Sequence, residues 1–189
     1  MSIAVQHAPL VLPEEYLAGE ELAEQKHEYL NGVVYATAGG TMRHSALAVR
    51  IVALLYPQLR GKNCQPYNSD LLVRIAIGDD LRFYYPDATI YRGPVDETAR
   101  VIDDPSVVFE VLSESTARTD TGEKRMAYLT IPTLEAYVLV DSADREVTVW
   151  CKTGGNWSPE VFTRPEDTLT FASADCSLSV GEIYEGTGI

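Results

Sequence analysis

The chain has 189 residues, of which 46% are hydrophobic and 23% charged, and its formal net charge is -13. This length and composition suit one globular domain with a sizeable core. The negative charge argues against a protein that coats DNA through a broad basic surface, because such binding needs cations that neutralise the phosphates. A small basic site on an acidic body stays compatible with the charge.

The sequence shows no secretory or membrane-spanning pattern. The opening "MSIAVQHAPLVLPEEY" lacks a basic segment followed by a long apolar one, and no apolar run elsewhere approaches the about 20 residues that span a bilayer. We therefore expect a soluble cytoplasmic protein. The cysteines Cys64, Cys151 and Cys176 are far apart without C-x-x-C spacing, which favours structural thiols over a zinc site or a disulfide framework.

The N-terminal part is predicted to contain an arm, a helix and a hairpin. Residues 1–12 form the arm, and residues 13–189 form a single domain. Pro13 suits the first turn of a short helix. The dipeptide Asn31-Gly32 separates two apolar runs and is a strong hairpin signal.

Residues 43–59 give the clearest helix pattern. Apolar side chains recur there at helical spacing, at Leu47, Ile51, Leu54 and Leu55. After this helix the pattern predicts one strand over 64–77, the turn "GDDLR", and another strand over 83–91. Pro86 has no N–H group, so it belongs at a strand start or edge.

The segment 106–113, "SVVFEVLS", is apolar on both faces apart from Glu110, which is typical of a central strand. A helix of about three turns is predicted within 119–132, where Asp120 and Glu123 have capping-box spacing.

The C-terminal part predicts strands over 134–141, 145–152 and 156–164. Residues 178–189 are expected to hold a strand end, one helical turn and a tail. The mixed order of helices and strands indicates an α/β domain with a mixed sheet. Additional antiparallel strands are expected between residues 135 and 171.

Glu110 needs a partner, because a buried carboxylate is costly unless a cation or hydrogen-bond donors compensate it. The sequence offers Asp87 near a strand start and Lys124 in the following helix. Two carboxylates brought together repel unless a divalent metal lies between them, and Mg2+ prefers oxygen ligands completed by water. A lysine beside them can neutralise a phosphate or orient a water molecule. These residues therefore predict a site that hydrolyses phosphodiesters.

Each of these residues also has a purely structural interpretation. Asp87 follows a proline and fits a turn or strand end, and Lys124 fits a solvated helix surface. Glu110 is better explained by function, because the structural interpretation still leaves it without a partner. Lys124 shares a helix face with Ala127, Tyr128 and Ile131, so it can point toward the sheet.

Several segments together resemble the Uma-type restriction endonuclease family, a bacterial branch of the PD-(D/E)XK nuclease superfamily. They are "HEYLNGVVYATAGG", "NSDLLV", "YYPDATIY", "VVFEVLSEST", "DTGEKRMAY" and "IPTLEAYVLVD", together with His44. The resemblance spans about residues 12 to 185. It implies a restriction-endonuclease-like α/β fold, with a mixed sheet core flanked by helices. It also implies a homodimeric endonuclease that cuts DNA with Mg2+ or Mn2+.

By this resemblance, Asp87 and Glu110 are the catalytic carboxylates that bind the metal, and Lys124 is the catalytic lysine. The superfamily motif places a lysine two residues after the second acid, where this sequence has Leu112. The resemblance implies that the lysine has moved to the next helix.

Four further residues match the family pattern, and three of them keep an alternative. Glu28 reaches the metal region or is a surface acid beside the hairpin. Asp70 lines the same pocket or caps a turn. His44 contacts substrate or makes a local hydrogen bond at its helix start. Asp120 is interpreted as a helix N-cap.

The leading hypothesis is a metal-dependent endonuclease that acts on DNA. A second hypothesis, favoured by the charge of -13, is a binding or regulatory module that keeps the nuclease fold without cutting. A third is a metal-dependent hydrolase of another phosphate ester.

Overall fold

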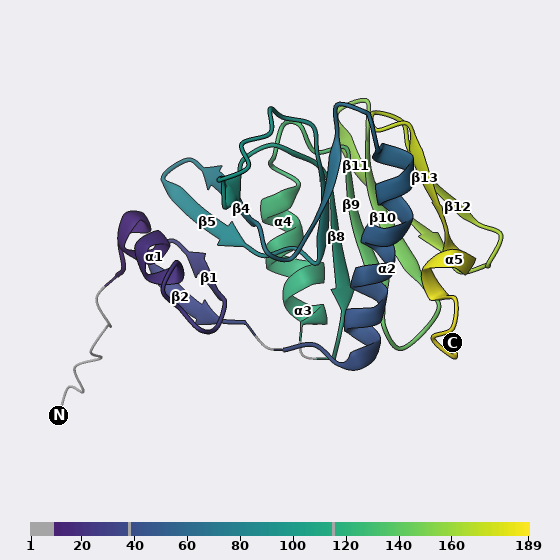
Figure 1. Cartoon of the computed structure of the whole chain (residues 1–189), viewed down its shortest axis with the longest axis horizontal. Coiled ribbons are helices and arrows are strands. Elements are labelled where there is room, and N and C mark those ends of the chain that lie inside the picture. Colours follow the sequence, from purple (N-terminus) through teal and green to yellow (C-terminus); the bar gives the residue numbers. More distant parts are fainter. Residues whose placement is uncertain (1–9, 38, 115) are drawn as a thin grey trace.

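The computed structural model describes residues 10–37, 39–114 and 116–189 (Figure 1). The helices are α1 (Pro13–Glu20), α2 (Met42–Leu59), α3 (Ala117–Thr119), the π-helical turn η1 (Asp120–Lys124), α4 (Arg125–Tyr128) and α5 (Val180–Tyr184). The strands are β1 (His27–Leu30), β2 (Val33–Ala36), β3 (Gln65–Asn68), β4 (Leu72–Ile77), β5 (Asp80–Tyr84), β6 (Ala88–Tyr91), β7 (Val101–Ile102), β8 (Pro105–Leu112), β9 (Ala136–Asp141), β10 (Val147–Thr153), β11 (Asn156–Phe162), β12 (Thr168–Phe171) and β13 (Cys176–Ser179). Most of the expected N-terminal arm, residues 1–12, lies outside the described residues, and α1 begins at Pro13 as the sequence predicts.

The strands form a six-stranded sheet in the order β11-β10-β9-β8-β6-β3 and a five-stranded sheet in the order β2-β1-β5-β4-β7. A two-stranded sheet, β12-β13, lies beside α2 and α5 (Figure 1). Among the described strands, β8 and β9 run parallel in the larger sheet, and β4 and β7 run parallel in the smaller one. The mixed sheet that the sequence predicts is therefore confirmed.

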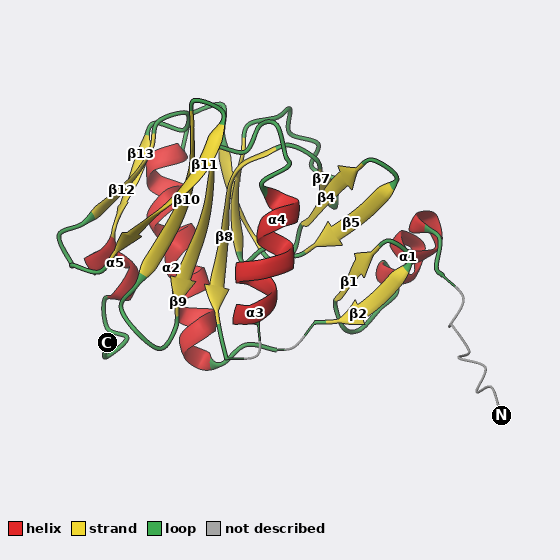
Figure 2. Ribbon diagram, turned by 180° about the vertical axis from the view of Figure 1, so that it is seen from behind, coloured by secondary structure: helices red, strands yellow, loops and turns green. Residues whose placement is uncertain are grey.

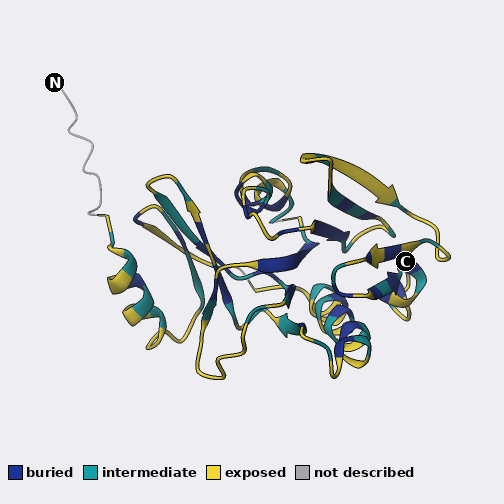
Figure 3. Ribbon diagram, turned by 90° about the horizontal axis from the view of Figure 1, so that it is seen from above, coloured by how far each residue is buried: buried dark blue, intermediate teal, exposed yellow. Residues whose placement is uncertain are grey.

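Strand β8 is the centre of the fold, and its first seven residues are buried. Val107, Phe109 and Val111 point into the core that contains α2, whereas Val108 points into the core that contains α4. Helix α2 and the segment α3–α4 consequently cover opposite faces of the larger sheet (Figure 2). The buried central strands stand out against the exposed surface of α1 in Figure 3. Glu110 has the same strand parity as Val108 and faces the α4 side.

Helix α2 confirms the predicted helix and begins one residue earlier. Thr41 caps it, since its Oγ1 accepts a hydrogen bond from the His44 backbone N–H at 3.2 Å. The core face consists of the fully buried Leu47, Ile51, Leu55 and Leu59. Leu54 is only partly buried against this core.

The predicted hairpin at Asn31-Gly32 is confirmed as β1 and β2. Asn31 has φ 45° and Gly32 has φ 95°, which are the left-handed conformations that a tight two-residue hairpin turn requires. Strand β1 also pairs with β5, so the hairpin forms one edge of the smaller sheet.

Two predicted strands are wrong, because the chain crosses between the sheets within each. Residues 64–77 divide at Ser69 into β3, in the larger sheet, and β4, in the smaller sheet. The Asn68 side chain accepts from the Asp70 N–H at 3.2 Å and stabilises the turn. Residues 83–91 divide around Pro86, which cannot continue the strand ladder.

The helix predicted within 119–132 begins earlier, at Ala117, and the N-cap interpretation of Asp120 is wrong. Asp120 lies inside the helical segment, in the turn η1, and the residue before α3 is Thr116. A π-helical turn widens the helix locally and is frequent at functional sites. Here it places Asp120 and Lys124 on the buried side of the helix.

The C-terminal strands confirm the expected antiparallel set and extend the central sheet. Strand β10 pairs antiparallel with both β9 and β11, and β9 joins β8 in parallel. Strand β13 leads into the short helix α5, as predicted. In the described part of the chain, no helix is long and apolar enough to cross a membrane. The thiols of Cys64, Cys151 and Cys176 are free.

The α2 core face yields a stability prediction. Ile51→Ala should lower the free energy of unfolding by about 2–5 kcal/mol, because it removes a fully buried side chain and leaves a cavity. Val49→Ala is the matched control on the same helix, since Val49 is 66% exposed. Urea unfolding measures both variants, and equal midpoints for the two would contradict this packing.

Candidate active site

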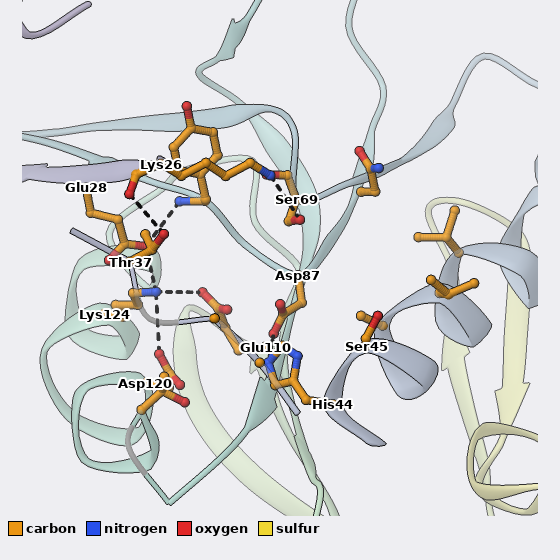
Figure 4. A pocket seen from close by; sticks show the side chains of 18 of the residues that line it. Lys26, Glu28, Thr37, His44, Ser45, Ser69, Asp87, Glu110, Asp120 and Lys124 are labelled. Carbon is orange, nitrogen blue, oxygen red and sulfur yellow. Dashed lines mark hydrogen bonds and ion pairs between the residues drawn. The ribbon is translucent and has the colours of Figure 1, made fainter. Parts of the chain in front are cut away.

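A cleft of about 1080 Å³ opens where the end of β8 meets α2, the segment α3–η1 and the β1–β2 hairpin. Its chemistry-bearing side chains include Glu28, His44, Asp87, Glu110, Asp120 and Lys124. They come from segments far apart in the sequence and converge on one region (Figure 4). The structure therefore brings the three predicted catalytic residues together with Glu28 and His44.

Glu110 is 3% exposed, and its nearest cation is the Lys124 ammonium. Lys124 Nζ lies 3.6 Å from Glu110 Oε1, which is an ion-pair distance but too long for a hydrogen bond. Glu110 Oε1 is buried without a hydrogen-bond partner in the described structure. The lysine compensates the charge of Glu110 while leaving this oxygen free to bind another group.

Lys124 has further acidic neighbours. Its Nζ lies 2.8 Å from Glu28 Oε1 and 3.5 Å from Asp120 Oδ1, and 5.4 Å from the centre of the Tyr84 ring. Burial alone would lower the pKa of Lys124, but the surrounding carboxylates raise it above its ordinary 10.5. The surrounding carboxylates therefore favour the charged ammonium form of Lys124.

Asp87 is held by groups on two different elements. His44 Nε2, from α2, lies 3.2 Å from Asp87 Oδ2, and the Val111 backbone N–H donates to the same oxygen at 2.7 Å. The contact with Asp87 raises the pKa of His44 above its ordinary 6.5, although burial acts in the opposite direction. Strand β8 thereby fixes Asp87 through Val111, the residue next to Glu110.

The cleft carries an excess of negative charge. Burial raises the pKa of both Glu110 and Asp120, and neighbouring carboxylates add to this rise while Lys124 partly opposes it. Asp120 Oδ1, like the Glu110 oxygen, is buried without a hydrogen-bond partner in the described structure. A cation placed between these carboxylates would relieve their mutual repulsion.

The donor set fits a hard divalent cation bound through few protein ligands. Carboxylate oxygens are the ligands of Mg2+, which usually keeps several waters and uses one or two carboxylates together with substrate phosphates. Within residues 10–37, 39–114 and 116–189, no group of three or more His, Cys, Asp or Glu side chains forms a ready-made metal cage. Asp87 and Glu110 suit the more open kind of site.

Asp70, unlike the other candidates, does not line the main cleft, although its partner Lys26 does. It pairs with Lys26 at 2.7 Å, and its N–H bonds to Asn68, so it fits the turn alternative. The sequence singles out Asp120 as a helix cap and does not predict its place in the acidic cluster. Its position four residues before Lys124 was the available signal, because side chains with this spacing lie on one helix face.

The fold is of the restriction-endonuclease-like class. The family model described as "Uma2: Putative restriction endonuclease" matches residues 13–180. The chain therefore belongs to the Uma2 family, which confirms the resemblance noted in the sequence.

Relatives and a solved structure agree with this membership. The chain is 36% identical over 180 residues to "Uncharacterized protein slr1290" of Synechocystis sp. (strain ATCC 27184 / PCC 6803 / Kazusa), covering 94% of this chain and 93% of the relative. It is 29% identical over 155 residues to "Uncharacterized protein sll1609" of the same strain, covering 80% of this chain and 86% of the relative. A crystal structure from Anabaena variabilis ATCC 29413, titled a "putative nuclease belonging to DUF820", matches with a TM-score of 0.73 and 20% identity, covering 92% of this chain and 97% of that one. This last match supports the fold.

Burial of Glu110 predicts a pH-dependent gain in stability for Glu110→Gln. The folded state raises the pKa of Glu110 above its ordinary 4.5, because burial disfavours the ionised carboxylate. Below pH 4.5 the side chain is protonated in both the folded and the unfolded state, and its burial costs no stability through ionisation. As the pH rises toward the folded-state pKa, only the unfolded state ionises readily, so wild type loses stability. Glutamine does not ionise. In chelator, the variant should therefore melt above wild type, with a gap that widens as the pH rises from 4.5.

Thermal unfolding at a series of pH values measures this gap. Glu160→Gln is the matched control, since Glu160 is an exposed glutamate on β11. A gap that narrows with rising pH, or that is equal in the control, would contradict the burial cost assigned to Glu110.

Proposed function

We propose that this protein is a divalent-metal-dependent endonuclease that hydrolyses DNA phosphodiester bonds. The observation that carries the proposal is the buried Glu110 beside Lys124 in a cleft that also contains Asp87. Membership of the Uma2 family supports it. DNA is the proposed partner. A homodimer is proposed where both strands of a duplex are cut, because two strands then need two sites.

Asp87 and Glu110 would hold Mg2+ or Mn2+. When bound, such an ion supplies Lewis-acid stabilisation of the phosphate charge and a water of lowered pKa. His44 and the Val111 N–H hold Asp87 in place, so one of its oxygens is fixed while the carboxylate lines the cleft.

Lys124 would stabilise negative charge on the scissile phosphate. Its ammonium is preorganised by Glu28 at 2.8 Å and by Asp120 at 3.5 Å, so little reorganisation is needed when a phosphate enters. This role fits a lysine that is 8% exposed yet lines the cleft.

A non-cutting binding or regulatory module is the second candidate, and the net charge of -13 favours it. DNA binding releases counterions and therefore weakens steeply with added salt. Binding of a protein partner without such a salt slope, in a chain that cuts no nucleic acid, would support this second function.

Substitutions in the cleft provide the direct test of the nuclease. Asp87→Asn and Glu110→Gln should abolish Mg2+- or Mn2+-dependent cleavage of plasmid and single-stranded DNA, because each removes a proposed ligand charge. Lys124→Met should lower kcat by about 10²- to 10³-fold, as expected for loss of one preorganised charge stabiliser. Lys152→Met, at an exposed lysine of β10, is the matched control.

Gel-based cleavage assays measure these rates, and near-ultraviolet circular dichroism checks that each variant keeps its fold. Wild-type rates in folded Asp87→Asn or Glu110→Gln would contradict the assignment.

A further inference from the structure

The cleft has a second part that the proposed chemistry does not use. One wall is an apolar stripe on α2, made of Ala48, Val49, Val52, Ala53 and Tyr56. These positions follow helical spacing and lie next to the core face of the same helix. Val49 is 66% exposed and Tyr56 is 57% exposed, so the stripe faces open space.

The stripe is continuous with the acidic site. His44 and Ser45, from the first turn of α2, line the same cleft beside Asp87, and the stripe begins directly after them on that helix (Figure 4). A substrate whose phosphate lies at Lys124 would therefore have its neighbouring parts along α2.

The cleft lining offers few cations to a DNA backbone. Among the described lining residues, the lysines are Lys26 and Lys124, and both are already paired with carboxylates. Lys26 Nζ lies 2.7 Å from Asp70 and donates to the Ser69 carbonyl oxygen at 2.8 Å. Any DNA backbone needs cations, so this lining suits only a short stretch of phosphates. A duplex also keeps its base faces inside the stack, where the apolar stripe cannot contact them.

An unpaired strand presents different chemistry. Its bases are turned out of a stack and offer flat apolar faces, which bind aromatic and apolar side chains with little sequence preference. Tyr56 and the valines of the stripe provide such a surface, and Lys124 with the proposed metal provides the place for one phosphate.

We infer that the α2 stripe binds the bases of single-stranded DNA next to the phosphate that is cut, with Tyr56 as the stacking residue. This inference rests on the proposed nuclease function and specifies its substrate as unpaired DNA. The strand would run along α2 from Tyr56 toward His44, with its bases against the stripe.

Fluorescence anisotropy with the full-length protein tests the inference in the presence of chelator, where no cutting occurs. The probes are a fluorescein-labelled 15-nucleotide dT strand and a labelled duplex hairpin. We expect tighter binding of the single strand. Tyr56→Ala should weaken that binding by about 5- to 150-fold, the range measured for loss of one stacked base, and Tyr56→Phe should leave it unchanged.

Val161→Ala is the matched control, because Val161 is 56% exposed on β11 and does not line the cleft. Equal binding by wild type and Tyr56→Ala would overturn the inference, as would equal or tighter binding of the duplex or no binding of the single strand. A second copy of the chain seated on the stripe would also overturn it. Sedimentation would then show a dimer that Tyr56→Ala dissociates.

Failure of this inference can be distinguished from failure of the proposed nuclease function. Metal-dependent duplex cleavage that Tyr56→Ala leaves unchanged would overturn this inference and retain the nuclease. Single-strand binding that depends on Tyr56, without cleavage by any divalent metal, would retain the binding site and overturn the nuclease.

Discussion

The burial of Glu110 in the central strand is the constraint on which the site depends. Strand β8 is covered on both faces, so the Glu110 side chain is only 3% exposed where it lines the cleft, and an isolated charge there would be costly. The ion pair with Lys124 offsets this cost. Glu28 and Asp120 lie beside Lys124 and favour its charged form in this buried position. The result is a cluster in which acids outnumber the lysine. An acidic surplus around a rigid ammonium is a suitable environment for a divalent cation and a phosphate.

The surrounding elements are arranged to deliver these side chains. The break around Pro86 lets the chain pass from β5 to β6, and Asp87 lies in this crossing. The β1–β2 hairpin at Asn31 carries Glu28. Pairing of β1 with β5 holds this hairpin where Glu28 contacts Lys124. The π-helical turn places both of its cleft residues on the buried face. Irregular backbone therefore occurs where the side chains converge, while the regular strands provide the rigid support.

Local patterns predicted much of this fold. The periodicity of 43–59, the Asn31-Gly32 turn and the apolar run around Glu110 each have a local physical cause, and each is found in the structure. The two strands that cross between sheets were predicted as continuous, because strand propensity does not encode which sheet a segment joins. Asp120 was interpreted as a cap for a similar reason. The capping-box spacing of Asp120 is a local pattern. Its place inside the helix depends on the turn α3 that precedes it and on the packing of Asp120 beside the buried Lys124.

The candidate site was predictable in part for the same reasons. Glu110 is conspicuous because it interrupts an apolar strand, and the family resemblance connected it with Asp87 and Lys124. The apolar stripe on α2 could not be recognised from the sequence. A helix that packs on a sheet has apolar residues in any case, and only the structure separates the core face from the exposed Val49 and Tyr56.

Calorimetric titration of Mn2+ into the purified protein tests the central claim most directly, because it requires no assumption about the substrate. The account predicts saturable binding by wild type and by the control Glu160→Gln, and binding at least about tenfold weaker for Glu110→Gln, as loss of a ligand charge implies. Absence of binding by wild type, or equal affinity in Glu110→Gln, would contradict the assignment of the buried glutamate as a metal ligand.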